Sequence, residues 1–100
     1  MRVVTPKKLR EYSVKHPQAK IPLLYWYEIV KSAKWKSLAD IKTDFNSVDY
    51  VANNRYVFNV KGNDFRLIVI IIFVSQKVYI RFIGTHPEYD KISTKQIKEI

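Results

Sequence analysis

The chain has 100 residues, of which 47% are hydrophobic, 14% are aromatic and only two are glycine. This length and composition predict one globular domain over residues 1–100 and argue against a disordered chain. The net charge of +9, from 18 Lys and Arg against 9 Asp and Glu, favours a polyanionic partner such as nucleic acid or an acidic protein segment.

The absence of cysteine excludes disulfides, thiolate catalysis and cysteine-based zinc sites, and it is typical of the reducing cytosol. The first residues lack the apolar core of a signal peptide, and the longest apolar run, LIVIIIFV at 67–74, is too short to span a bilayer. We therefore expect a cytoplasmic protein with no membrane partner.

Two helices are predicted in the N-terminal half. TPKKLREYSVKH predicts a helix over 5–16, with Thr5 as N-cap and Pro6 in the first helical position, ended by Pro17. From Ile21, IPLLYWYEIVKSAKW repeats large apolar residues at helical spacing and predicts a second helix packed on a core. The residues expected to pack in this way are Leu23, Leu24, Tyr25, Trp26, Tyr27, Ile29, Val30 and Trp35.

A short third helical turn is predicted after Ser37 as N-cap, with Phe45 folding back onto the core. From residue 55 the apolar period changes to two, which predicts strands over 55–60, 65–73 and 78–84 joined by the turns KGND and VSQK. In the last strand, Val78, Ile80 and Phe82 are expected to share one face. The fold class is therefore α+β, with two N-terminal helices packed on a twisted, mainly antiparallel sheet of three strands, or four if the N-terminal residues pair. The tail at 92–100 reads as a short helix or a frayed end.

Polar residues on one face of the three predicted strands can lie close together although they are distant in sequence, because adjacent strands are about 5 Å apart. The candidates are Asn59, Lys61, Arg66, Arg81 and the segment 86–91. Such a cluster combines cations with a histidine and a tyrosine and lacks a set of metal ligands. This combination indicates a site that binds and cleaves a phosphodiester substrate. RNA supplies its own 2′-hydroxyl nucleophile, so neither a metal nor a cofactor is required.

Each candidate also has a structural interpretation. His86 can simply end the strand, Tyr89 can be a core aromatic, and Lys61 can be a solvated turn residue. Arg66 is harder to explain in this way, since an arginine in a buried strand needs a partner or a purpose.

The chain resembles the HigB toxins of bacterial toxin–antitoxin pairs, in the wider RelE/ParE superfamily. The stretches that carry the resemblance are WY at 26–27, SAKWKSLADIK, NRYVFNVKGNDFRLIV and YIRFIGTHPEYDKI. It implies a RelE-like fold, cleavage of mRNA on the translating ribosome, and a cognate, HigA-like antitoxin.

The resemblance also implies roles for individual residues. Arg66 matches the strand arginine that contacts the scissile phosphate, and His86 matches a loop position that is histidine in HigB-like members. Tyr89 and Asp90 fall where the family keeps a tyrosine and an acidic neighbour. Lys61 lies near the strand lysines of the nuclease members, whereas Asn59 replaces an expected lysine and leaves the general base open between His86 and Tyr89. The residues expected to contact RNA are Asn59, Arg55, Arg81, Asp90 and Lys91.

Two other functions remain open at this point. One is a basic nucleic-acid-binding module without catalysis, for which the pair of His86 and Tyr89 would be unnecessary. The other is a toxin that acts on a protein target, as ParE-type members act on DNA gyrase; those lack the loop histidine and the strand cations.

Overall fold

The computed structural model describes residues 1–100 and has an α+β architecture. Its strands are β1 (Arg2–Val3), β2 (Asp49–Ala52), β3 (Arg55–Val60), β4 (Phe65–Ile72) and β5 (Lys77–Thr85). Its helices are α1 (Lys7–Lys15), the 3-10 turn η1 (Pro17–Ala19), α2 (Lys20–Ser32), α3 (Leu38–Asp44), α4 (His86–Asp90) and α5 (Thr94–Ile97).

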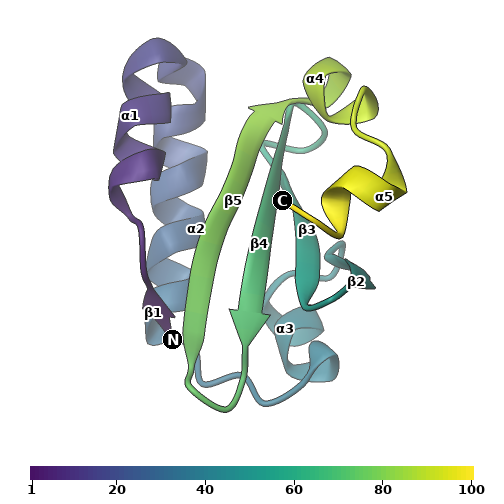
Figure 1. Ribbon diagram of the computed structural model, residues 1–100. Helices are drawn as coiled ribbons and strands as arrows, with labels where there is room; N and C mark the ends of the chain where they lie inside the picture. The colour runs from purple at the N-terminus through teal and green to yellow at the C-terminus, as the bar shows by residue number, and fades with distance from the viewer.

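The five strands form one mixed sheet in the order β1-β5-β4-β3-β2 (Figure 1). The β2–β3, β3–β4 and β4–β5 pairs are antiparallel, and the short β1 pairs in parallel with the start of β5. The N-terminal pairing anticipated from the sequence is therefore confirmed. The strand β2 was not predicted, so the sheet has five strands rather than three or four.

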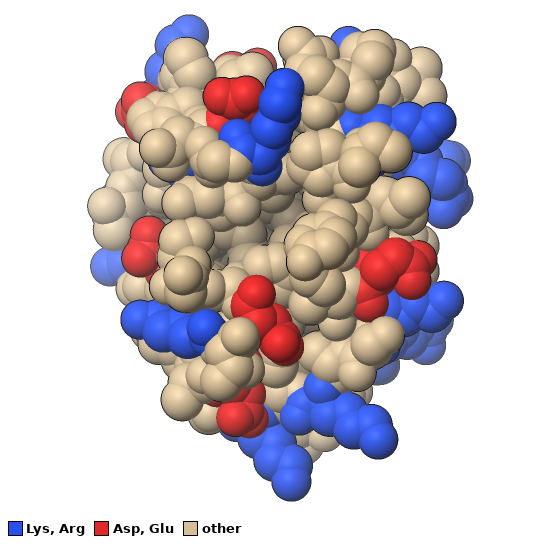
Figure 2. Space-filling model, turned by 180° about the vertical axis from the view of Figure 1, so that it is seen from behind, with Lys and Arg blue, Asp and Glu red and all other residues tan.

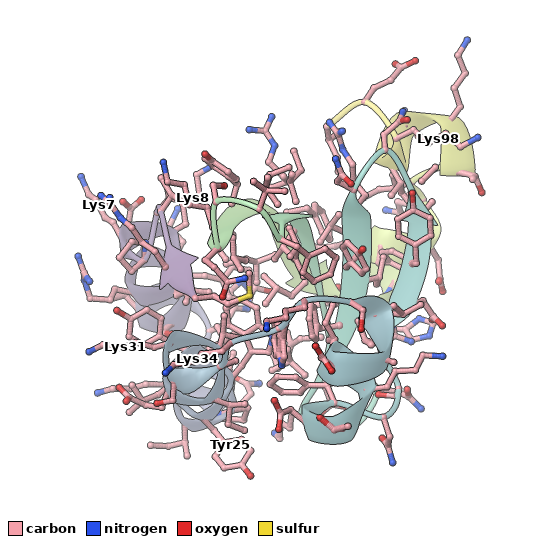
Figure 3. The ribbon with its side chains drawn as sticks, turned by 90° about the horizontal axis from the view of Figure 1, so that it is seen from below. Lys7, Lys8, Tyr25, Lys31, Lys34 and Lys98 are labelled. Carbon is pink, nitrogen blue, oxygen red and sulfur yellow. The ribbon has the colours of Figure 1, made fainter.

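The main core lies between the sheet and the N-terminal helices. Leu23, Trp26 and Val30 of α2 are buried against alternate residues of β3 and β4, among them Phe58. The Trp26 and Phe58 rings meet edge to face at 5.5 Å, and Phe45 folds back onto Phe58 as expected. Viewed from below, α2 and α3 lie on one side of the sheet and α5 on the other (Figure 3).

A smaller apolar cluster occupies the opposite face of the sheet. Val57 of β3, Ile68 of β4 and Ile97 of α5 are buried together, and Phe82 and Tyr89 pack against them. The C-terminal segment thus forms a helix rather than a frayed end, and it covers the face of β4 that carries Arg66. Because both faces of β4 are covered, its apolar run is nearly continuous, as its sequence predicts.

The helix predictions need correction at α1 and α2, whereas the predicted cap of α3 is confirmed. Pro6 rather than Thr5 is the N-cap of α1, which ends at Lys15. Ser37 caps α3 as expected, accepting a hydrogen bond from the Asp40 N–H. On α2, Leu24 and Tyr25 are exposed and not part of the core, because only one stripe of the helix faces the sheet.

A β-bulge changes the predicted alternation of β5. Phe82 pairs with Ile68 and Ile80 pairs with Val69, so Arg81 between them has no partner on β4. The extra residue moves Ile83 to the main core and Phe82 to the smaller cluster, opposite to the strict alternation expected from sequence. No helix is both long and apolar enough to cross a bilayer.

Candidate active site

Three residues form a row across the central strands at one end of the sheet. Asn59 on β3 pairs with Arg66 on β4, and Arg66 pairs with Gly84 on β5. Directly paired residues point to the same face of a sheet. Arg66 therefore lies between Asn59 and Gly84, and Gly84 precedes His86 by two residues in the chain.

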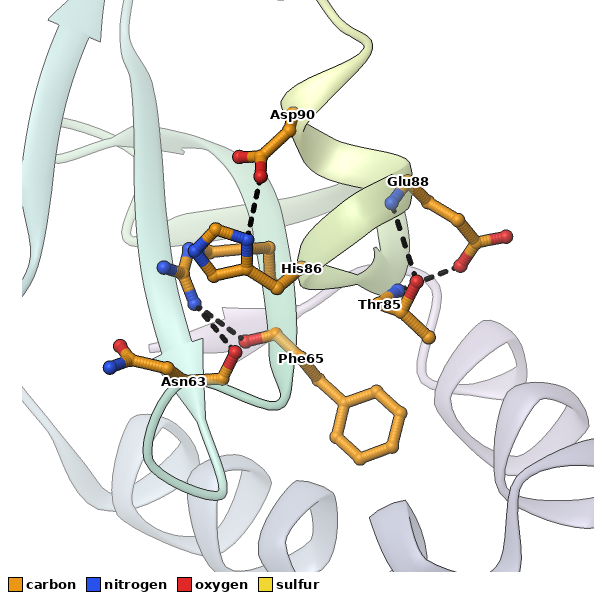
Figure 4. A network of polar contacts seen from close by, with 7 residues as sticks. Asn63, Phe65, Thr85, His86, Glu88 and Asp90 are labelled. Atoms are coloured by element: carbon orange, nitrogen blue, oxygen red, sulfur yellow. Dashed lines mark hydrogen bonds and ion pairs between the residues drawn. The ribbon is translucent and has the colours of Figure 1, made fainter.

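The guanidinium of Arg66 has no carboxylate partner. Its Nη1 donates weak hydrogen bonds to the main-chain oxygens of Asn63 at 3.3 Å and Phe65 at 3.4 Å (Figure 4). Its Cζ lies 5.6 Å from the centre of the Tyr89 ring, within cation–π range. No ion pair neutralises the guanidinium, so its remaining N–H donors and its charge are available to an anion.

Helix α4 begins where β5 ends, and a capping box fixes the junction. The Thr85 N–H donates to the Glu88 Oε1 at 2.7 Å, and the Glu88 N–H donates to the Thr85 hydroxyl at 3.3 Å. These hydrogen bonds with Thr85 hold the pKa of the Glu88 carboxyl below its ordinary value. The His86 N–H also donates to the Asp64 carbonyl at 3.1 Å, which ties α4 to the turn between β3 and β4. Residues 86–90 are thus a helical turn rather than the expected loop.

His86 and Asp90 are paired within this helical turn. The His86 Nδ1 lies 2.8 Å from the Asp90 Oδ2, at i and i+4 (Figure 4). When the carboxylate accepts this hydrogen bond, the neutral imidazole carries its proton on Nδ1 and its Nε2 is an acceptor. The pair therefore has the arrangement of an oriented general base.

Tyr89 is held between the smaller apolar cluster and Arg66. Burial raises the pKa of the Tyr89 phenol above its ordinary value, and Asp49 and Asp90 raise it further, although the Arg66 charge acts in the opposite direction. The phenol is consequently protonated at neutral pH and is a hydrogen-bond donor rather than a base.

Lys61 lies in the β3–β4 turn, next to the Asn63 and Asp64 carbonyls that contact Arg66 and His86. Its backbone has a φ of +54°, and its Nζ is 3.7 Å from the Asp64 carboxylate. Lys61 therefore belongs to the same end of the sheet, with its charge partly balanced by Asp64.

Two predicted RNA contacts, Arg55 and Arg81, lie apart from this cluster. Arg55 is at the other end of β3, where its Nε and Nη2 donate to the Ile100 main-chain oxygen at 3.1 and 2.6 Å. Arg81, at the bulge, lines a separate cavity of about 270 Å³ together with Lys8 and Lys15 of α1. Lys91 is the exposed C-cap of α4 and directly follows Asp90, so it borders the cluster.

Two features of the site were missed in the sequence. The pattern T-x-x-E at 85–88 is a capping-box signature and signals that His86 begins a helix. Asp49 was overlooked because β2 was not recognised, although its charge acts on Tyr89. No three His, Cys, Asp or Glu side chains converge in a way that could hold a metal ion.

The fold and this cluster can be compared with known proteins. Residues 19–92 match the HigB toxin family, described as the RelE-like toxic component of a toxin-antitoxin system. The chain belongs to the HigB toxin family. It is 37% identical over 92 residues to the mRNA interferase toxin HigB of Escherichia coli K12, with 90% of this chain and 88% of the relative covered.

Two further relatives are similar over the same length. The mRNA interferase HigB of Shigella flexneri is 37% identical over 92 residues, with the same coverage of 90% and 88%. That of Escherichia coli O6:H1 is 28% identical over 95 residues, covering 93% of this chain and 92% of the relative.

Proposed function

We propose that this toxin is an mRNA endoribonuclease, acting as the toxic component of a type II toxin–antitoxin system. The relatives named as mRNA interferases support this assignment. The carrying observation is the 2.8 Å contact of His86 Nδ1 with Asp90, beside an arginine that has no carboxylate partner. A phosphate-binding module has no need of an oriented imidazole.

In the proposed reaction the ribose 2′-oxygen attacks the adjacent phosphorus, and His86 Nε2 accepts the 2′-hydroxyl proton. The P–O5′ bond breaks, and the 5′-oxygen leaves as a hydroxyl after taking up a proton. The products are a 2′,3′-cyclic phosphate and a 5′-hydroxyl end. No metal or cofactor takes part in this scheme.

The other site residues stabilise the charge of the reacting phosphate or orient the reacting groups. Arg66 and Lys61 stabilise the extra negative charge on the phosphorane, and Asn59 lies beside Arg66 to orient the phosphate. The protonated Tyr89 is the donor to the leaving 5′-oxygen, and Asp90 orients His86. General acid–base catalysis of this kind contributes roughly 10² to 10⁴ in rate.

The RNA is presented by the translating ribosome in this proposal, and the protein acts in the cytoplasm as a single domain. Arg55 and Arg81 are separated from the chemistry and Lys91 borders it, so the role of all three is to contact RNA around the site through phosphate charges. The antitoxin of the system is the second partner, and we propose that it is HigA-like.

The purified toxin, mixed with an mRNA in the presence and absence of translating ribosomes, tests this function. We expect new 5′-hydroxyl ends within the coding region when ribosomes are present. Binding of RNA without cleavage under both conditions would instead indicate a non-catalytic module. Growth arrest in cells without any cleavage would indicate a protein target.

A further inference from the structure

Asp49, the first residue of the edge strand β2, lies on the same face of the sheet as the candidate active site. It pairs with Val57 of β3, and directly paired residues point to the same face. Val57 belongs to the smaller apolar cluster, against which Tyr89 packs. The next residue, Tyr50, lies on the other face, where its ring is 5.1 Å from that of Tyr56 in the main core. Asp49 therefore borders the active site on the side of β2.

The register of the sheet places Asp49 near the expected phosphate position but not at it. Its partner Val57 precedes Asn59 by two residues on β3, and Asn59 pairs with Arg66. With about 3.4 Å per residue along a strand and about 5 Å between strands, the Asp49 and Arg66 backbones are roughly 12 Å apart. A carboxylate at this separation does not share the phosphate that Arg66 holds. The base of an adjacent nucleotide is within its reach.

The Asp49 carboxylate is free to accept hydrogen bonds. Asp49 is exposed and forms no ion pair in a chain whose net charge is +9. The C-terminal segment does not cover it, because that segment contacts the other end of the β2–β3 hairpin, at Asn53 and Arg55. The neighbouring carboxylates all have partners: Asp64 pairs with Lys61, Asp90 pairs with His86, and Glu88 belongs to the capping box of α4.

The chemistry of a carboxylate selects one of the four bases. An ionised carboxylate only accepts hydrogen bonds and repels phosphate, so its ligand in a bound RNA is a base. Guanine presents two adjacent donors, N1–H and the N2 amino group, on its Watson–Crick edge, and these match the two carboxylate oxygens. Adenine and cytosine present one amino group beside an acceptor nitrogen, and uracil presents one N–H between two carbonyls. Those acceptors repel the second carboxylate oxygen, so guanine is the favoured ligand. Single-stranded RNA leaves these edges open to a protein.

The position of Tyr89 indicates which nucleotide carries this base. The Tyr89 ring contacts the guanidinium of Arg66 at 5.6 Å, and its phenol lies close enough to Asp49 to feel the charge of that carboxylate. In the proposed reaction Tyr89 donates a proton to the leaving 5′-oxygen. The nucleotide that carries this oxygen therefore lies on the Asp49 side of the phosphate, 3′ to the cleaved bond.

We propose that Asp49 determines base specificity by binding the Watson–Crick edge of a guanine immediately 3′ to the cleaved bond. This inference rests on the proposed ribonuclease, because it concerns the substrate of the same site. Two parallel hydrogen bonds between a side chain and a base discriminate against the other bases by about 10-fold or more.

The test measures single-turnover cleavage, on translating ribosomes, of mRNAs that differ only in the base 3′ to the mapped cleavage position. The unmodified protein should cleave the guanine mRNA about 10-fold faster than the adenine, cytosine and uracil mRNAs. Inosine lacks the N2 amino group of guanine, so its substitution should slow cleavage by about 3-fold or more. The amide of Asp49→Asn offers one donor and one acceptor, which match adenine instead. This variant should lose the preference for guanine, favour adenine and no longer distinguish guanine from inosine.

Glu28→Gln is the matched control, since it also removes one exposed carboxylate that forms no ion pair, but from α2 on the side of the main core. Figure 2 shows this side of the molecule, where Asp and Glu side chains lie among Lys and Arg. The control should keep the preference for guanine.

Equal cleavage of the four mRNAs by the unmodified protein would overturn the inference, as would a guanine preference that survives Asp49→Asn. An Asp49→Asn variant that cleaves all four mRNAs more slowly by one common factor would also overturn it, because the role of Asp49 would then be structural. These outcomes leave the ribonuclease intact. Absence of cleavage of every mRNA by the unmodified protein would instead refute the proposed enzyme, and this inference with it.

Discussion

The guanidinium of Arg66 lies 5.6 Å from the centre of the Tyr89 ring and has no carboxylate partner. This relationship joins the central strand to α4 and leaves a cation without a carboxylate partner on the sheet face that also carries the smaller apolar cluster. Arg66→Ala is expected to lower kcat by about 10² to 10³, because it removes a preorganised charge at the phosphate. Arg66→Lys keeps the charge but not the planar donors, so we expect an intermediate loss of about 10-fold.

The cleavage rates of both variants are measured in single-turnover reactions with an mRNA on ribosomes. Arg81→Ala is the matched arginine control, and it should raise KM without lowering kcat, because Arg81 lies at the bulge away from this cluster. Full cleavage by a folded Arg66→Ala variant would remove Arg66 from the mechanism.

Asp90 is expected to act by orienting His86. Asp90→Asn retains the size of the side chain but replaces the acceptor that holds the Nδ1–H, so kcat should fall about 10- to 100-fold while KM changes little. The pH dependence of kcat should also change, since the variant no longer favours one tautomer of His86. A wild-type kcat for Asp90→Asn at every pH would show that the carboxylate has no positioning role.

The Tyr89 phenol is expected to keep its proton well into the alkaline range. Burial disfavours the phenolate and raises its pKa above the ordinary value, so the charged form appears only at higher pH than for an exposed tyrosine. Titration of the tyrosine ring carbons by NMR, with Tyr89→Phe to assign the resonance, measures this directly. Titration of Tyr89 below an exposed tyrosine such as Tyr25 would contradict the prediction and reopen a tyrosinate base.

The capping box of α4 should make stability depend on acid pH. Glu88 has a lowered pKa in the folded protein, so its contribution is present above the unfolded value of about 4.5 and is lost as the pH falls through the folded pKa. The unfolding midpoint of the unmodified protein should therefore fall over this acidic range more steeply than that of Glu88→Gln. Parallel pH curves for the two proteins would count against the linkage.

Gly84 is expected to tolerate no side chain without movement. A Cβ at this position would lie 2.4 Å from the Phe82 Cζ and 3.2 Å from the Glu88 Oε1. Gly84→Ala should lower the free energy of unfolding by about 1 to 3 kcal/mol and weaken cleavage, because Glu88 caps the start of α4 and Phe82 packs in the smaller apolar cluster with Tyr89. Both quantities can be measured on the same variant, by denaturant unfolding and by a cleavage assay. An unchanged free energy of unfolding together with an unchanged cleavage rate would contradict this prediction.

The pattern of apolar residues predicts much of this fold. The change of period at residue 55 locates β3, β4 and β5, and the turn residues place the connections close to where they occur. The short β2 lacks a distinct pattern, and Asp49 and Tyr50 in it are exposed, so only its pairing with β3 defines it. The bulge at Arg81 is a property of pairing with β4, and the sequence of β5 carries no local signal for it.

The sequence predicts part of the candidate site, because some of its residues stand out locally and others are brought in only by strand pairing and by the helical turn of α4. Arg66 stands out because it is charged within an apolar strand, and the register with Asn59 and Gly84 then places it near His86. The sequence predicts Asp90 as an RNA contact, whereas the structure pairs it with His86. This pairing depends on a helical turn, which the T-x-x-E pattern signals.

Mapping of mRNA 5′ ends after brief induction of the toxin in bacteria, with and without His86→Ala, tests the central claim most directly. The account predicts rapid new 5′-hydroxyl ends within translated regions for the unmodified toxin, and their loss in a His86→Ala variant that remains folded. Growth arrest without new ends would contradict a ribonuclease. Undiminished cleavage by His86→Ala would contradict the role of His86 as the general base.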